Sequence, residues 1–256
     1  MKRFASVFGL AARSSFWKCM AVVLAAAALV GVMLYMAPEH KTVHYQDNEG
    51  REQSYEAENS LWDLPGVSAA YVPMIIGFGG VCGLLAQTGW GKGAATGYTM
   101  RRLRVRKNTA CLTWAVYNFM MIVIFWAMTA LAAFLVIGLR AGNYSTPDSI
   151  GPQSVMLAFY SSAMLHHLVP GMDGLAWAGN VLGALACALG CADVAQKKWK
   201  GGTGGIALAF AVGLTMGEFY IQLSRNGNHI LFIIGEALVI GLVCYSWWGG
   251  GENEEE

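Results

Sequence analysis

Residues 91–109, GKGAATGYTMRRLRVRKNT, decide how the rest of the chain is arranged. This short basic segment lies between two long apolar runs, and it contains the cationic residues Lys92, Arg101, Arg102, Arg104, Arg106 and Lys107. Because moving so much positive charge across a membrane is costly, such a segment stays on the cytoplasmic side. We therefore predict that residues 91–109 form a cytoplasmic loop, which sets the direction of every neighbouring span.

The composition is typical of a membrane protein. Of the 256 residues, 55% are hydrophobic and only 13% are charged, with a mean hydropathy of +0.44. Soluble domains carry about 25% charged residues. The first apolar run is long enough to cross a bilayer and is not followed by a small-residue cleavage site in the usual register. We therefore expect it to remain as a span.

Six apolar runs are long enough to span a bilayer. They are residues 16–37, 67–87, 110–139, 172–195, 204–223 and 229–248. The predicted fold class is therefore all-α, a polytopic membrane helix bundle that forms a single transmembrane domain over residues 1–256. With the amino terminus inside, most lysines and arginines fall in internal segments, and the external ones are Lys41, Arg51, Arg140 and Arg225. This bias predicts that both termini are cytoplasmic.

Three further segments lie outside the predicted spans. Residues 1–15 are predicted to form an interfacial helix, because one helical face would carry Phe4, Val7, Phe8 and Ala11. Residues 38–66 are predicted to form an acidic external loop, too polar to enter lipid and too short for its own core. Residues 153–171 are apolar but short and end at Pro170-Gly171. We predict an external or re-entrant helix there.

Two acidic residues lie inside apolar runs, where ionisable groups are usually functional. Glu218 and Glu236 are about equally far from the turn that joins the last two spans, so antiparallel helices would place them at one depth. We predict a polar lining of a transport path or a proton-responsive pair. The alternative is interhelical hydrogen bonding to other polar groups in the spans, such as Asn118, Asn180 and Gln222. Asn118 and Asn180 are also candidates for the transport path.

Two pairs of residues have side chains that can bind metals. His166 and His167, near the end of the 153–171 helix, could sense pH or hold a metal, but we favour interfacial polar residues. Cys187 and Cys191 lie one helical turn apart without His or carboxylate partners at ligand spacing, which favours packing residues. We predict no metal site. No cysteine falls in an external loop, so we expect no disulfides.

Three pairs of glycines spaced four residues apart predict close helix packing. They are Gly79/Gly83, Gly179/Gly183 and Gly213/Gly217. In a chain with 32 glycines, such pairs support packing in general and identify no partner surface.

The sequence contains no recognisable enzyme motif. Residues 89–93, GWGKG, lack both the spacing of a phosphate-binding loop and the hydroxyl residue after its lysine. Metalloprotease and serine-hydrolase motifs are also absent from the sequence. We therefore expect a protein that is not an enzyme, with no cofactor, no ATP site of its own and no nucleic-acid partner.

Together these features resemble the permease subunit of the bacterial type-2 ABC exporter family. Residues 97–118, GYTMRRLRVRKNTACLTWAVYN, resemble its coupling-helix region, and residues 158–170, AFYSSAMLHHLVP, resemble an external segment of small permease-like proteins. The resemblance implies a separate ATP-binding subunit, a second permease copy, and a location in the bacterial cytoplasmic membrane. It also implies that the ATP-binding subunit contacts Tyr98, Arg101, Arg102, Arg104, Arg106 and Lys107.

The predicted function is thus the membrane-spanning subunit of an ATP-driven exporter, in which the basic loop couples a separate ATPase to substrate movement. One alternative is an accessory or sensor membrane protein that binds a partner through its external loop. Another is a proton-linked carrier that uses Glu218 and Glu236. The chain shows no internal repeat, which weakens the carrier hypothesis.

Overall fold

The computed structural model describes residues 2–46, 52–61, 63–87, 107–143, 152–199, 204–220 and 227–248. In chain order the elements are α1 (Lys2–Tyr35), β1 (His40–Gln46), β2 (Glu52–Glu58), α2 (Leu64–Val67), α3 (Tyr71–Ala86), α5 (Lys107–Asn143), α6 (Pro152–Ser161), α7 (Ala163–Leu168), α8 (Gly174–Trp199), α9 (Ile206–Tyr220) and α10 (Gly227–Trp248).

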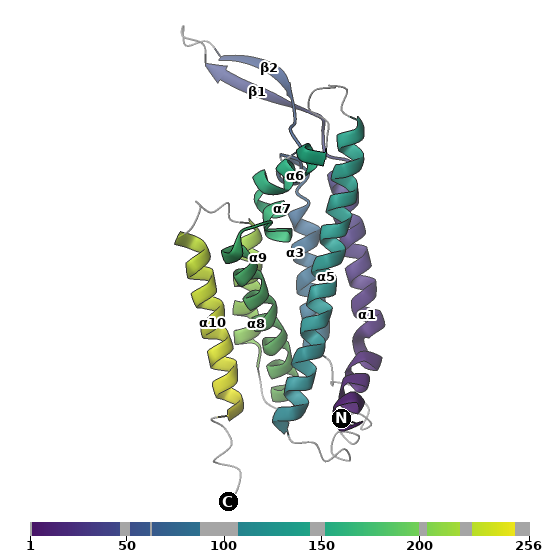
Figure 1. Cartoon of the computed structure of the whole chain (residues 1–256), viewed down its shortest axis with the longest axis vertical. Helices are drawn as coiled ribbons and strands as arrows, with labels where there is room; N and C mark the ends of the chain where they lie inside the picture. Colours follow the sequence, from purple (N-terminus) through teal and green to yellow (C-terminus); the bar gives the residue numbers. More distant parts are fainter. Residues whose placement is uncertain are drawn as a thin grey trace, which may run out of the picture.

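The long helices form an up-and-down bundle. In Figure 1, α1, α3, α5, α8, α9 and α10 all run roughly along the long axis of the molecule. Helix α5 packs against α1 and α8, and α8 packs against α9 and α10. The start of α1 and the end of α10 lie at one end of the bundle, and the β-hairpin extends from the other. The interior of the bundle is therefore built around α5 and α8.

Among the described residues, four helical stretches are long and apolar enough to cross a membrane, namely Ala5–Tyr35, Asn108–Gly142, Gly174–Lys198 and His229–Trp248. The apolar helices α3 and α9 are shorter, with 16 and 15 residues. At about 1.5 Å per residue, they cover roughly 24 Å and roughly 22 Å, less than the ~30 Å of a bilayer core. The helical membrane fold agrees with the prediction, whereas the count of six spans is not confirmed.

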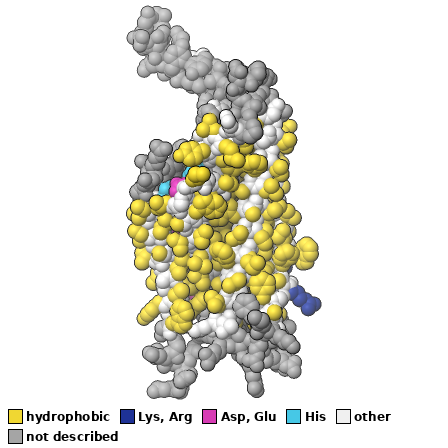
Figure 2. Space-filling model, viewed as in Figure 1, with side chains coloured by type: hydrophobic (Ala, Val, Ile, Leu, Met, Phe, Trp, Pro, Cys, Tyr) yellow, Lys and Arg dark blue, Asp and Glu magenta, His cyan; other side chains and the backbone are white. Residues whose placement is uncertain are grey.

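The surface of the bundle is largely apolar, as lipid contact requires. Figure 2 shows hydrophobic side chains over most of one face, interrupted near its upper end by histidine and acidic side chains. Large apolar side chains are exposed on several long helices, for example Leu24, Leu131 and Leu238. A water-soluble monomer seldom exposes so continuous an apolar surface.

The first helix has no break at residue 15, where the sequence predicted an interfacial helix to end. Residues 2–35 form one helix because a single buried stripe continues through the predicted boundary. Val7, Ala11 and Ser15 are buried at intervals of four residues. The Ser15 hydroxyl lies 3.0 Å from the hydroxyl of Tyr117 on α5, and Phe8 packs edge-on against the same ring.

Residues 38–66 contain a β-hairpin where the sequence predicted only a loop. Strands β1 and β2 pair antiparallel, with His40 opposite Glu58 and Gln46 opposite Glu52. Threonine, valine and tyrosine favour strands, but here they are few and lie among charged and polar residues in HKTVHYQ and EQSYEAE. The high charge of the segment hid this strand pattern, so the all-α prediction holds for the bundle and misses the hairpin.

Residues 153–171 form two short helices, α6 and α7, instead of one. The chain is extended at Ser162, with φ −83° and ψ 126°, which separates them. On α6, Ala158 is buried while Met156 and Tyr160 are exposed, so the exposed face of this helix also carries large apolar side chains. In contrast, α7 is mostly buried and packs against α5 and α9. The second helix of the pair thus enters the bundle.

Near the C-terminal end of α8, the buried carboxylate of Asp193 joins α8 to α10. Asp193 accepts hydrogen bonds from the Ser246 hydroxyl at 2.9 Å and the Trp247 indole at 3.2 Å, both on α10. Lys197, one turn further along α8, lies 2.7 Å from the same carboxylate. Because this acid is paired and hydrogen-bonded, we assign it to holding the two helices together.

Candidate functional site

Three ionisable side chains from separate elements meet inside the bundle. His167 lies in the last turn of α7, Glu218 lies near the end of α9, and His229 lies in the first turn of α10. One potential ligand atom from each lies within 4.8 Å of the others, and all three residues are buried. We call these three residues the His–Glu cluster. Within the described part of the chain, it is the one group of three such side chains that converge this closely.

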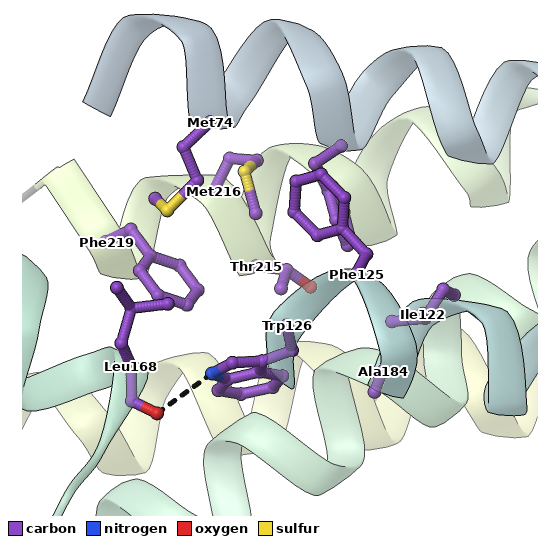
Figure 3. A pocket seen from close by; sticks show the side chains of 10 residues that line it. Met74, Ile122, Phe125, Trp126, Leu168, Ala184, Thr215, Met216 and Phe219 are labelled. Carbon is purple, nitrogen blue, oxygen red and sulfur yellow. Dashed lines mark hydrogen bonds between the residues drawn. The ribbon is translucent and has the colours of Figure 1, made fainter. Parts of the chain in front are cut away.

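The position of His167 follows from the way α7 ends. Pro170 lies two residues beyond the helix, and the last carbonyls of any helix lack partners within it. Here the Asn180 side chain donates to the carbonyl of His167 at 2.7 Å. The Trp126 indole donates to the carbonyl of Leu168 at 3.0 Å, as Figure 3 shows. These bonds from α8 and α5 hold the end of α7 inside the protein.

Glu218 and His229 form the direct contact of the cluster. The Nδ1 atom of His229 lies 3.0 Å from an Oε1 oxygen of Glu218, within hydrogen-bond distance. Helices α9 and α10 follow one another in opposite directions (Figure 1), so the end of one faces the start of the other. The antiparallel arrangement therefore brings residues 218 and 229 together.

The imidazole of His167 lies beside this pair without a hydrogen bond at its Nδ1 atom. Its ring centroid is 5.4 Å from that of His229 and 5.5 Å from that of Phe219. His167 is buried, so its Nδ1 atom is a polar atom that no protein group among the described residues uses.

Glycines on α8 make room for the two buried glutamates. A Cβ atom added at Gly179 would lie 2.9 Å from Oε1 of Glu218, and one at Gly183 would lie 2.5 Å from Oε1 of Glu236. Since Gly179 and Gly183 are one helical turn apart, the carboxylates of α9 and α10 pack against successive turns of the same face. This glycine pair therefore accommodates carboxylates, whereas the sequence analysis predicted helix-to-helix contact.

Glu236 is the least satisfied polar group in this region. It is fully buried, and neither carboxylate oxygen has a hydrogen-bond partner. The Thr215 hydroxyl also packs against the Gly183 position, but it donates its proton to the carbonyl of Ala211 at 2.9 Å. An unpaired buried carboxylate is costly, so its presence here points to a functional requirement.

The other predicted site residues lie at varied distances from the cluster. Asn180 contacts it through the His167 carbonyl, whereas Asn118 donates to the carbonyl of Ala188 at 3.2 Å and so joins α5 to α8 elsewhere. His166 is directed to Asp173, with 3.6 Å between Nε2 and the carboxylate. The basic-loop residues Tyr98, Arg101, Arg102, Arg104 and Arg106 lie outside the described residues. Lys107 begins α5, and its side chain is also outside them.

An apolar pocket adjoins the cluster. Its lining comes from several helices, and it includes Leu168 and Phe219, which directly follow the cluster residues His167 and Glu218. Figure 3 shows its side chains converging on one space, with Thr215 the polar member. The remaining lining residues are Met74, Phe78, Ile122, Phe125, Trp126, Ala184 and Met216. The cluster thus lies at the edge of an apolar space enclosed by the bundle.

Sequence reasoning missed His229. The sequence analysis predicts it as the first residue of the last span and does not connect it to the acids. One signal was available, because His229 and Glu236 are seven residues apart and thus on one face of a helix. The partnership with His167 had no such signal, since 62 positions separate residues 167 and 229 in the sequence.

Comparison with known proteins identifies no relative, because no protein family, curated protein or solved structure matches the chain.

Proposed function

We propose that this protein is a membrane-spanning transport subunit that acts with a separate ATP-binding subunit. The observation that carries the proposal is the group of ionisable side chains inside an apolar bundle, the His–Glu cluster together with Glu236. Ionisable groups at membrane depth are costly and face bundle interiors or transport paths. A protein with only an anchoring role has no need of them.

The coupling to an ATPase is proposed from the basic residues 91–109. In the sequence most of these residues lie between α3 and α5, and the end of α3 and the start of α5 lie at the end of the bundle where α1 begins (Figure 1). The exposed cations Arg13 and Lys18 belong to the first half of α1. We propose that this end is cytoplasmic, with both termini inside a bacterial cell membrane, because cytoplasmic segments are enriched in lysine and arginine.

The packing of α5 supports a route from the basic loop to the cluster. Helix α5 begins at Lys107, so the last three residues of the predicted 91–109 loop are helical. Helix α5 packs along α8, and α8 carries Gly179 and Gly183 beside the two glutamates. A push on the loop by an ATP-binding partner would move α5 against α8 as a rigid element. In a pair of such subunits, this motion would open and close a path between the helices.

A charge-reversal experiment tests the coupling. We expect the triple variant Arg101→Glu, Arg102→Glu, Arg104→Glu to lose co-purification of the ATP-binding subunit while still inserting into the membrane. The reason is that each substitution replaces attraction to the partner with repulsion. The measurement is affinity purification in mild detergent from the native cell, with bound subunits identified by mass spectrometry.

The matched control is Arg13→Glu with Lys18→Glu, which reverses two exposed cations outside the loop. We expect this control to retain the partner. Equal recovery of an ATP-binding subunit with the wild type and the triple variant would refute the coupling proposal.

A second candidate function is a sensor or accessory protein, and the β-hairpin is the observation that favours it. The hairpin projects beyond the helical bundle in Figure 1. Replacing residues 40–58 with a short Gly-Ser linker distinguishes the two functions. A sensor would lose its partner, whereas a transport subunit would still bind the ATP-binding subunit.

A further inference from the structure

The His–Glu cluster has the donor set of a transition-metal site. Two imidazoles and one carboxylate, from α7, α9 and α10, converge with donor atoms within 4.8 Å of one another. With bonds of 2.0–2.2 Å, the ligand atoms of a four-coordinate zinc site lie about 3.5 Å apart. Small side-chain rotations therefore suffice to bring the three donors onto one ion.

Charge balance in the bundle favours a cation at this position. Glu218 and Glu236 are both fully buried and pack against adjacent turns of α8. Across the described segments, no lysine or arginine forms an ion pair with either glutamate. Buried charges are paired or coordinate metals, since an isolated one is costly. A divalent ion bound by Glu218 would place positive charge beside both buried carboxyl groups and so stabilise their ionised forms.

The imidazole and carboxylate donors of the cluster indicate which metal ions would bind. Imidazole nitrogen with one carboxylate suits Zn²⁺ and related transition-metal ions, whereas Mg²⁺ and Ca²⁺ take oxygen ligands. Three protein ligands leave one position open on a four-coordinate ion, as in catalytic and exchangeable zinc sites. The unpartnered Nδ1 atom of the buried His167 is a donor that the protein leaves unused.

We propose that His167, Glu218 and His229 bind a single divalent transition-metal ion, with Zn²⁺ the best match among the common ions. The ion would take the place of the hydrogen bond between Glu218 and His229 and would recruit His167 as the third ligand. It would thereby tie α7, α9 and α10 together beside the apolar pocket.

Zinc binding by the purified full chain tests the proposal. The protein is prepared in detergent with a tag that contains no histidine, stripped with a chelator, and dialysed against buffered Zn²⁺. We expect about one equivalent of zinc per chain, as a three-ligand site provides. We also expect millimolar Mg²⁺ not to displace it. Substituting Co²⁺ should give the visible absorption of a tetrahedral nitrogen and oxygen site.

Ligand variants locate the ion. His167→Gln, Glu218→Gln and His229→Gln should each weaken Zn²⁺ binding by at least about tenfold, since removing even the outer partners of a metal site costs about 10–100-fold. Glu218→Asp keeps the carboxylate and should bind more tightly than Glu218→Gln. Size-exclusion profiles like that of the wild type are the check that each variant is folded when its Zn²⁺ affinity is compared.

The chain supplies a matched control. The triple variant His40→Gln, His44→Gln, His166→Gln removes every histidine outside the cluster and should bind zinc as the wild type does. Absence of stoichiometric binding by the wild type overturns the proposal. So does binding that the cluster variants leave unchanged or that the triple variant abolishes.

This test is independent of the transport proposal. It uses the isolated chain without any ATP-binding subunit, so loss of the ATPase interaction and loss of zinc binding are separate outcomes.

Discussion

At the scale of single residues, glycines that look alike in the sequence have different surroundings. A Cβ atom added at Gly77 on α3 would collide with the Cβ of Ala26 on α1 and would lie 3.3 Å from the ring of Phe125 on α5. At Gly79, two positions along the same helix, nothing lies within 4 Å. The predicted pair Gly79/Gly83 therefore makes no close contact in the described part of the chain, and Gly77 marks the tight crossing.

Alanine substitution tests this difference. We expect Gly77→Ala to destabilise the protein by about 1–3 kcal/mol, because the Ala26 Cβ is attached directly to the backbone and cannot rotate away. Gly79→Ala should be neutral or stabilising by up to about 1 kcal/mol, since alanine is the better helix former. Thermal unfolding of both variants in the same detergent measures the effect. Equal melting temperatures would show that the crossing is not tight.

At the scale of elements, α8 begins with a capping carboxylate. Asp173 precedes the helix and accepts hydrogen bonds from the backbone amides of Leu175 at 3.0 Å and Ala176 at 3.2 Å. Partial burial acts to raise the pKa of Asp173, but these amides and the His166 side chain outweigh it and lower the pKa below its usual range. The charged form is therefore favoured by the folded state.

The cap makes stability depend on pH in a defined direction. The folded state lowers the pKa of Asp173, so the cap contributes to the free energy of unfolding above the unfolded pKa of about 3.9. This contribution is lost as pH falls through the pKa of the folded state. Asp173→Ala should cost about 1 kcal/mol at pH 7, a typical loss for an N-cap. The difference from the wild type should shrink below about pH 4. Asp173→Asn, which still caps, is the control in the same pH series of melting curves.

At the scale of the whole molecule, the two ends of the bundle differ. The hairpin and the His–Glu cluster lie toward one end, and α1 starts and α10 finishes at the other, as Figure 1 shows for the hairpin and the helices. The proposed orientation places the hairpin outside the cell and residues 91–109 inside.

Five of the six cysteines are buried and Cys244 is partly buried, so the native thiols should interfere little with labelling of an engineered cysteine.

Labelling of engineered cysteines tests the orientation. In a Cys244→Ser background, Ser54→Cys on the exposed part of β2 should react with an impermeant maleimide on intact cells. Arg104→Cys should react only after the membrane is permeabilised, because an arginine-rich loop is retained inside. Labelling at position 104 from outside intact cells would reverse the orientation and remove the basis for ATPase coupling.

The sequence by itself determined the membrane class and the main helices, because the free energy of apolar side chains in lipid depends on composition and length alone. It also singled out Glu218, Glu236, His167 and Asn180, since polar groups within apolar runs stand out. Only the tertiary structure decided that His167 and His229 join Glu218, and that Gly179 and Gly183 accommodate the glutamates. The physical reason is that this site depends on helix rotation and on the entry of α7 into the bundle. Both are set by packing between elements distant in the chain.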